Sequence, residues 1–227
     1  VRQVQCHLGL DRAVGQAEAP MFCTILTPTE HMVIGDPARE GRLLSCGRET
    51  MFTTIAIMDD DGQLLPAGER GEIVVGGNLV MAGYYRNPEA TAEASRFGWH
   101  HTGDVGFKDA DGFVYIVDRK KDMVLRGGEN VYCAEVEAAL YRHPAVAEAV
   151  AFGVPDERLG EEVGAAIVVR EGASISADDL RAQAGQFISK HKIPRYVWIL
   201  RDALPRNANG KFLKRELRQT LPLSEAQ

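Results

Sequence analysis

Residues 117–130 read VDRKKDMVLRGGEN, and this stretch separates two halves of the chain that differ in pattern. Its first ten residues carry six charges, and a glycine pair follows at Gly127 and Gly128. So many charges make a poor core element, whereas paired glycines let backbone N–H groups approach a ligand closely. By its composition alone, this stretch is expected to be a solvated turn between two domains. The alternatives are a hinge and a phosphate-facing loop.

The half before this stretch is dominated by short strand patterns. These patterns cover residues 53–58, 72–77 and 112–117, with Asp- and Gly-rich turns between them. Asn87 is expected to cap a helix that begins at Pro88. A tight glycine turn at Gly103 is expected to present Asp104. This half therefore predicts a small β-barrel or a sheet.

The half after this stretch alternates helix and strand patterns. Helices are expected at about 134–141, from Ser176 to about Lys190, and at 214–220; strands are expected at 146–152, 164–169 and 196–200, with a polar loop at 155–162. Ser176 and Asp179 form a start that resembles a capping box. The fold class is therefore α+β. It combines short strands over residues 1–117, expected to form a distorted barrel or sheet packed on something larger, with a small α/β domain over 118–227 that has a roughly three-stranded sheet and flanking helices.

Composition narrows the class of protein. The chain has 227 residues, 45% hydrophobic and 26% charged, with a formal net charge of -6. The negative charge argues against a nucleic-acid partner, because phosphate neutralisation needs a basic surface. No apolar run approaches the roughly 20 residues that span a bilayer, although peripheral association stays open. Four scattered cysteines form no CxxC pair and favour a reducing, cytoplasmic location.

Short motifs in a fixed order carry a family resemblance. They read GYYRNPEAT at 83–91, HTGD at 101–104, DRKKD at 118–122 with the sequence onward to Glu137, and PRNANGK at 205–211. With them, the chain resembles the C-terminal portion of the adenylate-forming enzymes from about Val14 to Leu217. This superfamily includes acyl-CoA synthetases and the adenylation domains of peptide synthetases. The motifs are specific for the superfamily and poorly specific for the substrate, and we expect the chain to be a C-terminal segment.

The resemblance implies a ligase that uses ATP, Mg²⁺ and coenzyme A. Such enzymes join a carboxylate to AMP with release of pyrophosphate and then pass the acyl group to a thiol. By resemblance, Lys211 bridges carboxylate and phosphate oxygens, and Asp104 accepts hydrogen bonds from the ribose hydroxyls. Arg119 would add a donor to ribose or phosphate, and Glu18 would help to hold Mg²⁺. Cofactor contacts are also expected at Gly15, Gln16 and Thr102.

The resemblance also implies a change of conformation between two half-reactions. Asp118 corresponds to the hinge about which the small domain rotates. Lys211 would face the active site in one pose, and Gly127 and Gly128 would line the pantetheine tunnel in the other.

The chain departs from the family pattern in three places. Val14 stands where an aromatic residue is usual, Ala17 stands where a threonine is usual, and Cys133 stands where a proline is common. The first two changes should weaken adenine stacking and a phosphate contact. A phosphate loop ending in Pro-Lys-Gly is absent from this sequence. We therefore expect activity only in the full-length protein.

Three functions stay open at this point. The leading one is an acyl-CoA synthetase for a small-molecule carboxylic acid, expected to be fatty or similarly apolar because of Met21, Phe22 and Cys23. The others are an adenylation domain that charges a carrier protein and a non-catalytic module that binds CoA or a nucleotide. The sequence is silent on the identity of the acid, on the oligomeric state and on acetylation of Lys211.

Overall fold

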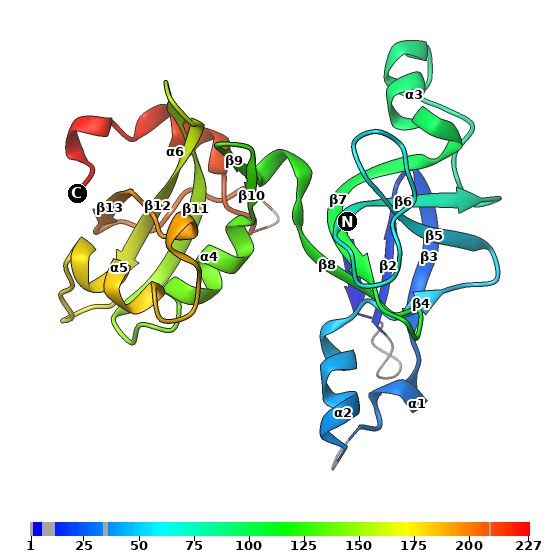
Figure 1. Ribbon diagram of the computed structural model, residues 1–227, viewed down its shortest axis with the longest axis horizontal. Helices are drawn as coiled ribbons and strands as arrows, with labels where there is room; N and C mark the ends of the chain where they lie inside the picture. Colours follow the sequence, from blue (N-terminus) through cyan, green and yellow to red (C-terminus); the bar gives the residue numbers. More distant parts are fainter. Residues whose placement is uncertain (1, 6–11, 34–35, 209) are drawn as a thin grey trace. The chain divides into compact units, whose positions relative to one another are not determined.

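The computed structural model describes residues 2–5, 12–33, 36–208 and 210–227. The chain divides into two compact units, Val1–Lys120 and Lys121–Gln227 (Figure 1). Each unit has its own hydrophobic core, so each is described by itself. The sequence analysis placed the boundary before Asp118, and the role of that residue as a hinge stays a prediction.

The described residues of unit 1 form two antiparallel sheets of four strands each. The first has the order β1 (Arg2–Gln5), β2 (Arg12–Gln16), β3 (Ala19–Leu26) and β4 (Arg48–Glu49); the second has the order β5 (Thr53–Met58), β6 (Gly71–Gly77), β7 (His100–Lys108) and β8 (Val114–Arg119). Ile55 and Ile57 of β5 point into the core, as the alternation of this strand predicts. The described strands form open sheets, so the barrel expected from the sequence is not closed in this part of the chain.

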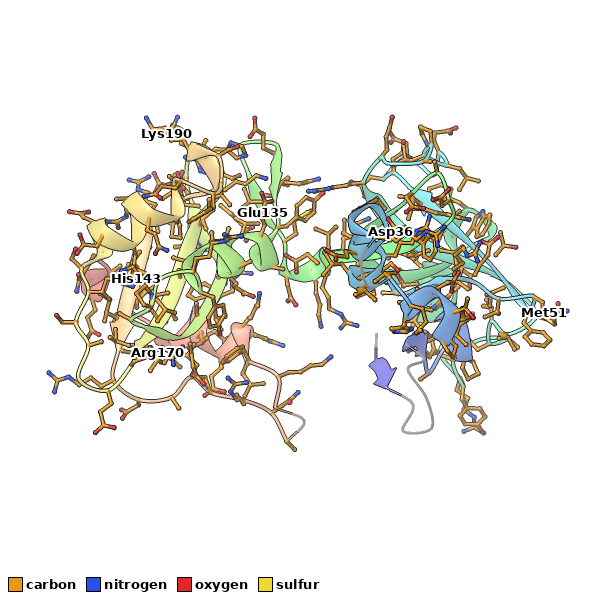
Figure 2. The ribbon with its side chains drawn as sticks, turned by 90° about the horizontal axis from the view of Figure 1, so that it is seen from below. Asp36, Met51, Glu135, His143, Arg170 and Lys190 are labelled. Atoms are coloured by element: carbon orange, nitrogen blue, oxygen red, sulfur yellow. The ribbon has the colours of Figure 1, made fainter. Side chains whose placement is uncertain are left out.

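Short helices flank the sheets of unit 1. They are α1 (Pro28–His31), α2 (Pro37–Glu40), α3 (Pro88–Ala94) and the 3₁₀ segments η1 (Gly41–Leu44) and η2 (Arg96–Gly98). Asn87 caps α3 as predicted, because its Oδ1 accepts a hydrogen bond from the Ala90 amide at 3.1 Å. Met51, in the turn before β5, is 89% exposed and points away from the sheet (Figure 2).

Unit 2 is built on a five-stranded sheet. Its path is β10 (Glu129–Val131), β9 (Val124–Arg126), β12 (Gly160–Val169) and β11 (Val146–Asp156), and β13 (Tyr196–Leu200) pairs in parallel with β12. The sequence predicted only about three strands, because the short hairpin of β9 and β10 is hidden among charges and glycines. The polar loop expected at 155–162 is largely the end of the β11–β12 hairpin.

Helices cover both faces of this sheet (Figure 1). They are α4 (Cys133–Leu140), α5 (Ala177–Ala184) and α6 (Lys214–Thr220), with 3₁₀ segments η3 (Lys120–Asp122) at the unit boundary, η4 (Lys190–Lys192) and η5 (Leu223–Glu225). Val136 of α4 and Leu180 of α5 pack on one face, and Leu217 of α6 packs on the other. Helix α5 ends before Gly185, earlier than the expected Lys190, although the predicted capping box is present.

The helix layers confirm the α+β class. Glu135 of α4 accepts hydrogen bonds from Lys192 at 2.7 and 2.9 Å, which ties the η4 segment to this helix. No helix among the described residues combines the length and the apolar character that crossing a bilayer requires.

Candidate active site

The HTGD motif forms a bulge inside β7. Thr102, Gly103 and Asp104 stand opposite Ile73 alone, because the pairing of β6 with β7 is interrupted there. Gly103 has φ of +72°, which glycine adopts without steric cost. The Thr102 hydroxyl donates to the Ile73 carbonyl at 2.6 Å and accepts from the Asp104 amide at 3.1 Å. The expected tight turn is therefore a bulge within a strand, a feature that re-aims a side chain.

Asp104 is held beside Arg119. Asp104 is only 2% exposed, and Arg119 Nε donates to its Oδ1 at 3.1 Å. Burial raises the pKa of the Asp104 carboxyl above its ordinary value, and the guanidinium of Arg119 opposes this shift. Arg119 ends β8 directly opposite Asp104 on β7. The structure thus brings together Asp104, which the resemblance assigned to the ribose, and Arg119, which it assigned to ribose or phosphate.

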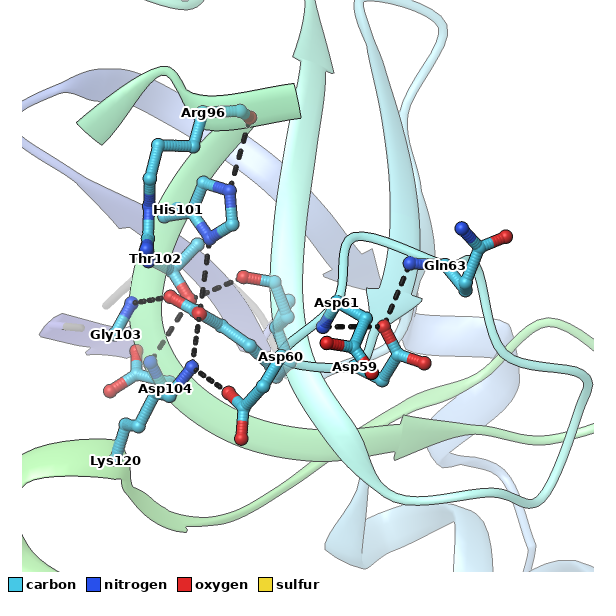
Figure 3. Close-up of polar contacts among 12 residues, drawn as sticks. Asp59, Asp60, Asp61, Gln63, Arg96, His101, Thr102, Gly103, Asp104 and Lys120 are labelled. Atoms are coloured by element: carbon cyan, nitrogen blue, oxygen red, sulfur yellow. Dashed lines mark hydrogen bonds and ion pairs between the residues drawn. The ribbon is translucent and has the colours of Figure 1, made fainter. Parts of the chain in front are cut away.

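A second buried carboxylate accepts a hydrogen bond from the bulge, at the Gly103 amide labelled in Figure 3. Glu72 Oε1 accepts from the Gly103 amide at 3.1 Å, and its Oε2 lies 3.0 Å from both His101 Nδ1 and Lys120 Nζ. Lys120 also donates to Asp60 at 2.6 Å. Burial opposes ionisation of Glu72, but these partners outweigh it and lower its pKa. The sequence analysis missed this network, whose only signal is one acid within an apolar strand pattern.

Replacing Glu72 by Gln is expected to lower the free energy of unfolding at neutral pH by roughly 3 kcal/mol. This is the lower end for a broken buried ion pair, because Lys120 keeps 34% of its side chain exposed. The lowered folded pKa means that the contribution is present above the ordinary glutamate pKa and is lost as pH falls through the folded value.

Urea unfolding over a series of pH values measures this effect. The matched control is Glu69→Gln, which changes an exposed glutamate of the same unit. Equal stability of the two variants at neutral pH would contradict the structural role of Glu72.

Four of the predicted cofactor residues surround one cavity. The cavity has a volume of about 30 Å³ and is lined by Gly15, Gln16, Thr102 and Asp104 together with apolar side chains of the core. Gln16 Nε2 lies 3.0 Å from the buried His100 Nε2. Because a volume of about 30 Å³ suits one water molecule, this cavity is not a complete nucleotide pocket.

Glu18 lies in the turn between β2 and β3. The hydroxyl of Tyr84, from the GYYRNPEAT motif, donates to its Oε1 at 2.9 Å. The described residues contain no cluster of three or more His, Cys, Asp or Glu side chains that could hold a metal. Mg²⁺ commonly binds one or two carboxylates plus phosphate oxygens and waters. Glu18 fits the role of one such carboxylate, with the other ligands supplied by a nucleotide and water.

In unit 2, the predicted glycine pair lies in the turn between β9 and β10, here called the glycine loop (residues 126–129). Gly127 and Gly128 are exposed and have φ of +58° and +87°. The Gly127 amide donates to the Leu159 carbonyl at 2.8 Å, and a Cβ added at Gly128 would meet no atom within 4 Å. The loop therefore presents backbone, rather than side chains, to its surroundings.

Lys211 lies in a second loop of unit 2, here called the Lys211 hairpin (residues 206–208 and 210–212). Its amide donates to Asn207 Oδ1 at 3.0 Å, and its carbonyl accepts from the Asn207 amide at 2.8 Å. The residue is exposed, so the hairpin holds the backbone and leaves the side chain in solvent. Asp118, the predicted hinge, lies within β8 and pairs with Val105.

A segment of each unit matches a known family. A family model described as AMP-binding enzyme matches residues 3–85, and one described as AMP-binding enzyme C-terminal domain matches residues 135–211. The chain belongs to the adenylate-forming, AMP-binding enzymes. Feruloyl-CoA synthase from an Amycolatopsis species is 45% identical over 175 residues, which are 77% of this chain and 35% of that protein. A medium/long-chain-fatty-acid–CoA ligase from Mycobacterium tuberculosis is 40% identical over 211 residues, 90% of this chain and 36% of that protein.

Solved structures of AMP-binding enzymes share the fold. The o-succinylbenzoate CoA synthetase from Bacillus subtilis, in complex with its acyl-adenylate intermediate, is 35% identical with a TM-score of 0.78, over 93% of this chain and 41% of that chain. An amide bond synthetase from Marinactinospora thermotolerans is 37% identical with a TM-score of 0.77, over 92% and 41%. This chain spans about a third of the length of the curated relatives it matches, at 35% and 36% for the two described above.

Proposed function

We propose that the chain forms the C-terminal part of an AMP-forming acid–thiol ligase. In the first half-reaction, a carboxylate oxygen of the acid attacks the α-phosphorus of ATP, and the bond to pyrophosphate breaks. In the second, a thiol sulfur attacks the acyl carbon and AMP leaves. The observation that carries the proposal is the bulge at Asp104, which sets a buried carboxylate beside Arg119 and next to the cavity at Gly15 and Gln16.

Unit 1 would bind the nucleotide. An ionised carboxylate only accepts hydrogen bonds, so Asp104 suits the two ribose hydroxyls, which both donate. Arg119 is 37% exposed and keeps donors available for ribose or phosphate. Mg²⁺ would neutralise phosphate charge when bound, with Glu18 as one carboxylate ligand.

Unit 2 would supply a different loop to each half-reaction. The exposed ammonium of Lys211 would stabilise charge that develops between the carboxylate and the α-phosphate. The glycine loop would form a thin backbone wall beside the pantetheine of coenzyme A. Replacing the Lys211 hairpin by the glycine loop at the active site requires a rotation of unit 2, for which we propose a hinge near Asp118.

The acid substrate is proposed to be apolar, with a fatty acid as the first choice. The curated relatives described above are named for a feruloyl and a fatty acyl group, so they support an acid–CoA ligase more firmly than any single acid. Ala17 and Val14 should weaken nucleotide binding relative to the family pattern, and cytoplasmic activity is proposed for the full-length protein only.

The test is exchange of labelled pyrophosphate into ATP by the full-length protein, with a panel of fatty and aromatic acids. We expect exchange that depends on the acid and thioester formation when coenzyme A is added. Exchange with thioester formation only on a carrier protein would indicate a carrier-charging adenylation domain. Absence of exchange with every acid, combined with retained binding of ATP or coenzyme A, would indicate a non-catalytic binding module and contradict the proposal.

A further inference from the structure

Two carboxylates on the central hairpin of unit 2 each hold one of the two loops. Glu148 lies on β11 and pairs with Arg206, at the base of the Lys211 hairpin. Glu162 lies on β12 and pairs with Arg126, at the base of the glycine loop. The two pairs share no residue, so each loop is attached to the sheet by its own contact.

The pair at the Lys211 hairpin is reinforced on both sides. Glu148 Oε1 accepts from Arg206 Nη2 at 2.8 Å, and its Oε2 accepts from the Leu204 amide at 2.8 Å. Burial opposes ionisation of Glu148, but these bonds outweigh it and lower its pKa. Arg206 Nη1 also donates to the Gly210 carbonyl at 2.8 Å. One guanidinium therefore links the sheet to the residue directly before Lys211.

Packing fixes the plane of this guanidinium. Arg206 lies over the ring of Phe212, 3.7 Å from its centroid, and the two residues also form a β-bridge across the hairpin. Because the planar fork of arginine donates in fixed directions, loss of the Glu148 carboxylate would release one side of the hairpin from the sheet.

The pair at the glycine loop is bidentate and more deeply buried. Arg126 donates to Glu162 through Nε and Nη2, both at 2.8 Å, and the Glu162 side chain is 3% exposed. Arg126 also pairs in register with Gly160, next to the Leu159 carbonyl that accepts from the Gly127 amide. Since both glycines lack a side chain that could pack, the loop is held at its two ends. Arg126 forms its fork with Glu162, and Glu129 Oε2 lies 3.1 Å from His191 Nε2.

We propose that Glu148 and Glu162 are positioning residues with separate tasks: Glu148 places Lys211 for adenylation, and Glu162 places the glycine loop for thioester formation. This inference rests on the proposed function and deepens it. Its physical basis is that Glu148 orients Arg206 and Glu162 orients Arg126, and each of these two arginines holds one loop. Glu162 also lies 3.8 Å from Arg195 Nη1, outside both loops. Each carboxylate acts through the arginine and the loop it holds.

The kinetic test uses Glu148→Gln and Glu162→Gln in the full-length protein, with Glu171→Gln at an exposed site of unit 2 as the matched control. Glu148→Gln should slow pyrophosphate exchange about 10- to 100-fold, the usual cost of misplacing a reacting group, and leave thiolysis of supplied acyl-adenylate within about twofold. Glu162→Gln should slow thiolysis of supplied acyl-adenylate by a similar factor and leave pyrophosphate exchange within about twofold. Arg206→Lys and Arg126→Lys, which keep the charge and lose the fork, should repeat the two patterns if a glutamine variant does not fold.

A structural readout separates this inference from the proposed function. Backbone hydrogen exchange should become about tenfold faster at the Lys211 hairpin in Glu148→Gln and at the glycine loop in Glu162→Gln, each without change in the other loop. An inactive wild type that shows these two separate effects would overturn the proposed function alone. The separate positioning roles would be overturned if both variants slowed both half-reactions equally. They would also be overturned if the rate of backbone hydrogen exchange in the two loops did not change.

Discussion

Replacement of Lys211 by Ala is expected to lower acid-dependent pyrophosphate exchange by about 10²- to 10³-fold, the effect of removing one group that stabilises transition-state charge. Thiolysis of a supplied acyl-adenylate should stay within about twofold of wild type, because the second half-reaction is proposed to use the glycine loop. The side chain is exposed on a hairpin whose backbone is bonded through Asn207, so the fold should not depend on it.

The control for this variant is Lys190→Ala, which removes another exposed lysine from unit 2. Thermal unfolding of both variants checks that the domain remains folded. A loss of exchange and of thiolysis by the same factor would contradict the role of Lys211, since it would show that the lysine serves both steps.

The second large effect is expected at Asp104. Asp104→Asn should raise the KM for ATP by about 100-fold, because hydrogen bonds to a charged acceptor contribute about 1.5–3 kcal/mol each. The amide retains one acceptor for Arg119, and burial already disfavours the charge of Asp104, as its raised pKa shows, so the free energy of unfolding should change by less than about 1 kcal/mol. ATP titrations and urea unfolding of the same samples give the two values.

Asp61→Asn, at an exposed position of unit 1, is the matched control. The pKa of Asp104 is raised by burial, so folding disfavours its ionised form, and its contribution to stability is fully present below the ordinary aspartate pKa and is lost as pH rises through the raised folded value. An unchanged KM for ATP in Asp104→Asn would remove Asp104 from the nucleotide site.

Local signals predicted much of the fold. The strand at Thr53–Met58 alternates in sequence as it does in burial, Asn87 caps α3, and the start of α5 has its capping box. The strand at Tyr196–Leu200 also has the expected bounds. These features depend on residues that are close together in the chain, which is why a single sequence contains them.

Features that depend on distant partners were predicted less well. The bulge at Thr102–Asp104 exists because of how β7 pairs with β6, and no local pattern distinguishes it from a turn. The hairpin of β9 and β10 joins the sheet through one pairing of Arg126 with Gly160, and its charges and glycines indicated a loop. The α5 helix ends at Ala184, where the chain turns through Gly185 to bury Ile188 in the core.

The candidate site shows the same division. The motifs supplied Asp104, Arg119 and Lys211, which are proposed to touch substrates. The acids that hold the bulge, the Lys211 hairpin and the glycine loop were not predicted, because each is far from its partner in the sequence. Glu72 lies 31 positions from Gly103, Glu148 lies 58 from Arg206, and Glu162 lies 36 from Arg126. Each of these acids stands within a largely apolar strand, and that pattern is the only sequence signal for a carboxylate that needs an ion-pair partner.

The central claim is that this chain serves an enzyme that activates an acid as its adenylate before any thiol takes part. The most direct measurement is exchange of labelled pyrophosphate into ATP by the full-length protein, with and without acid and coenzyme A. The account predicts label in ATP whenever acid is present, including in the absence of coenzyme A, with AMP as the nucleotide product of the complete reaction. Exchange that requires coenzyme A, or formation of ADP and phosphate in place of AMP and pyrophosphate, would contradict it.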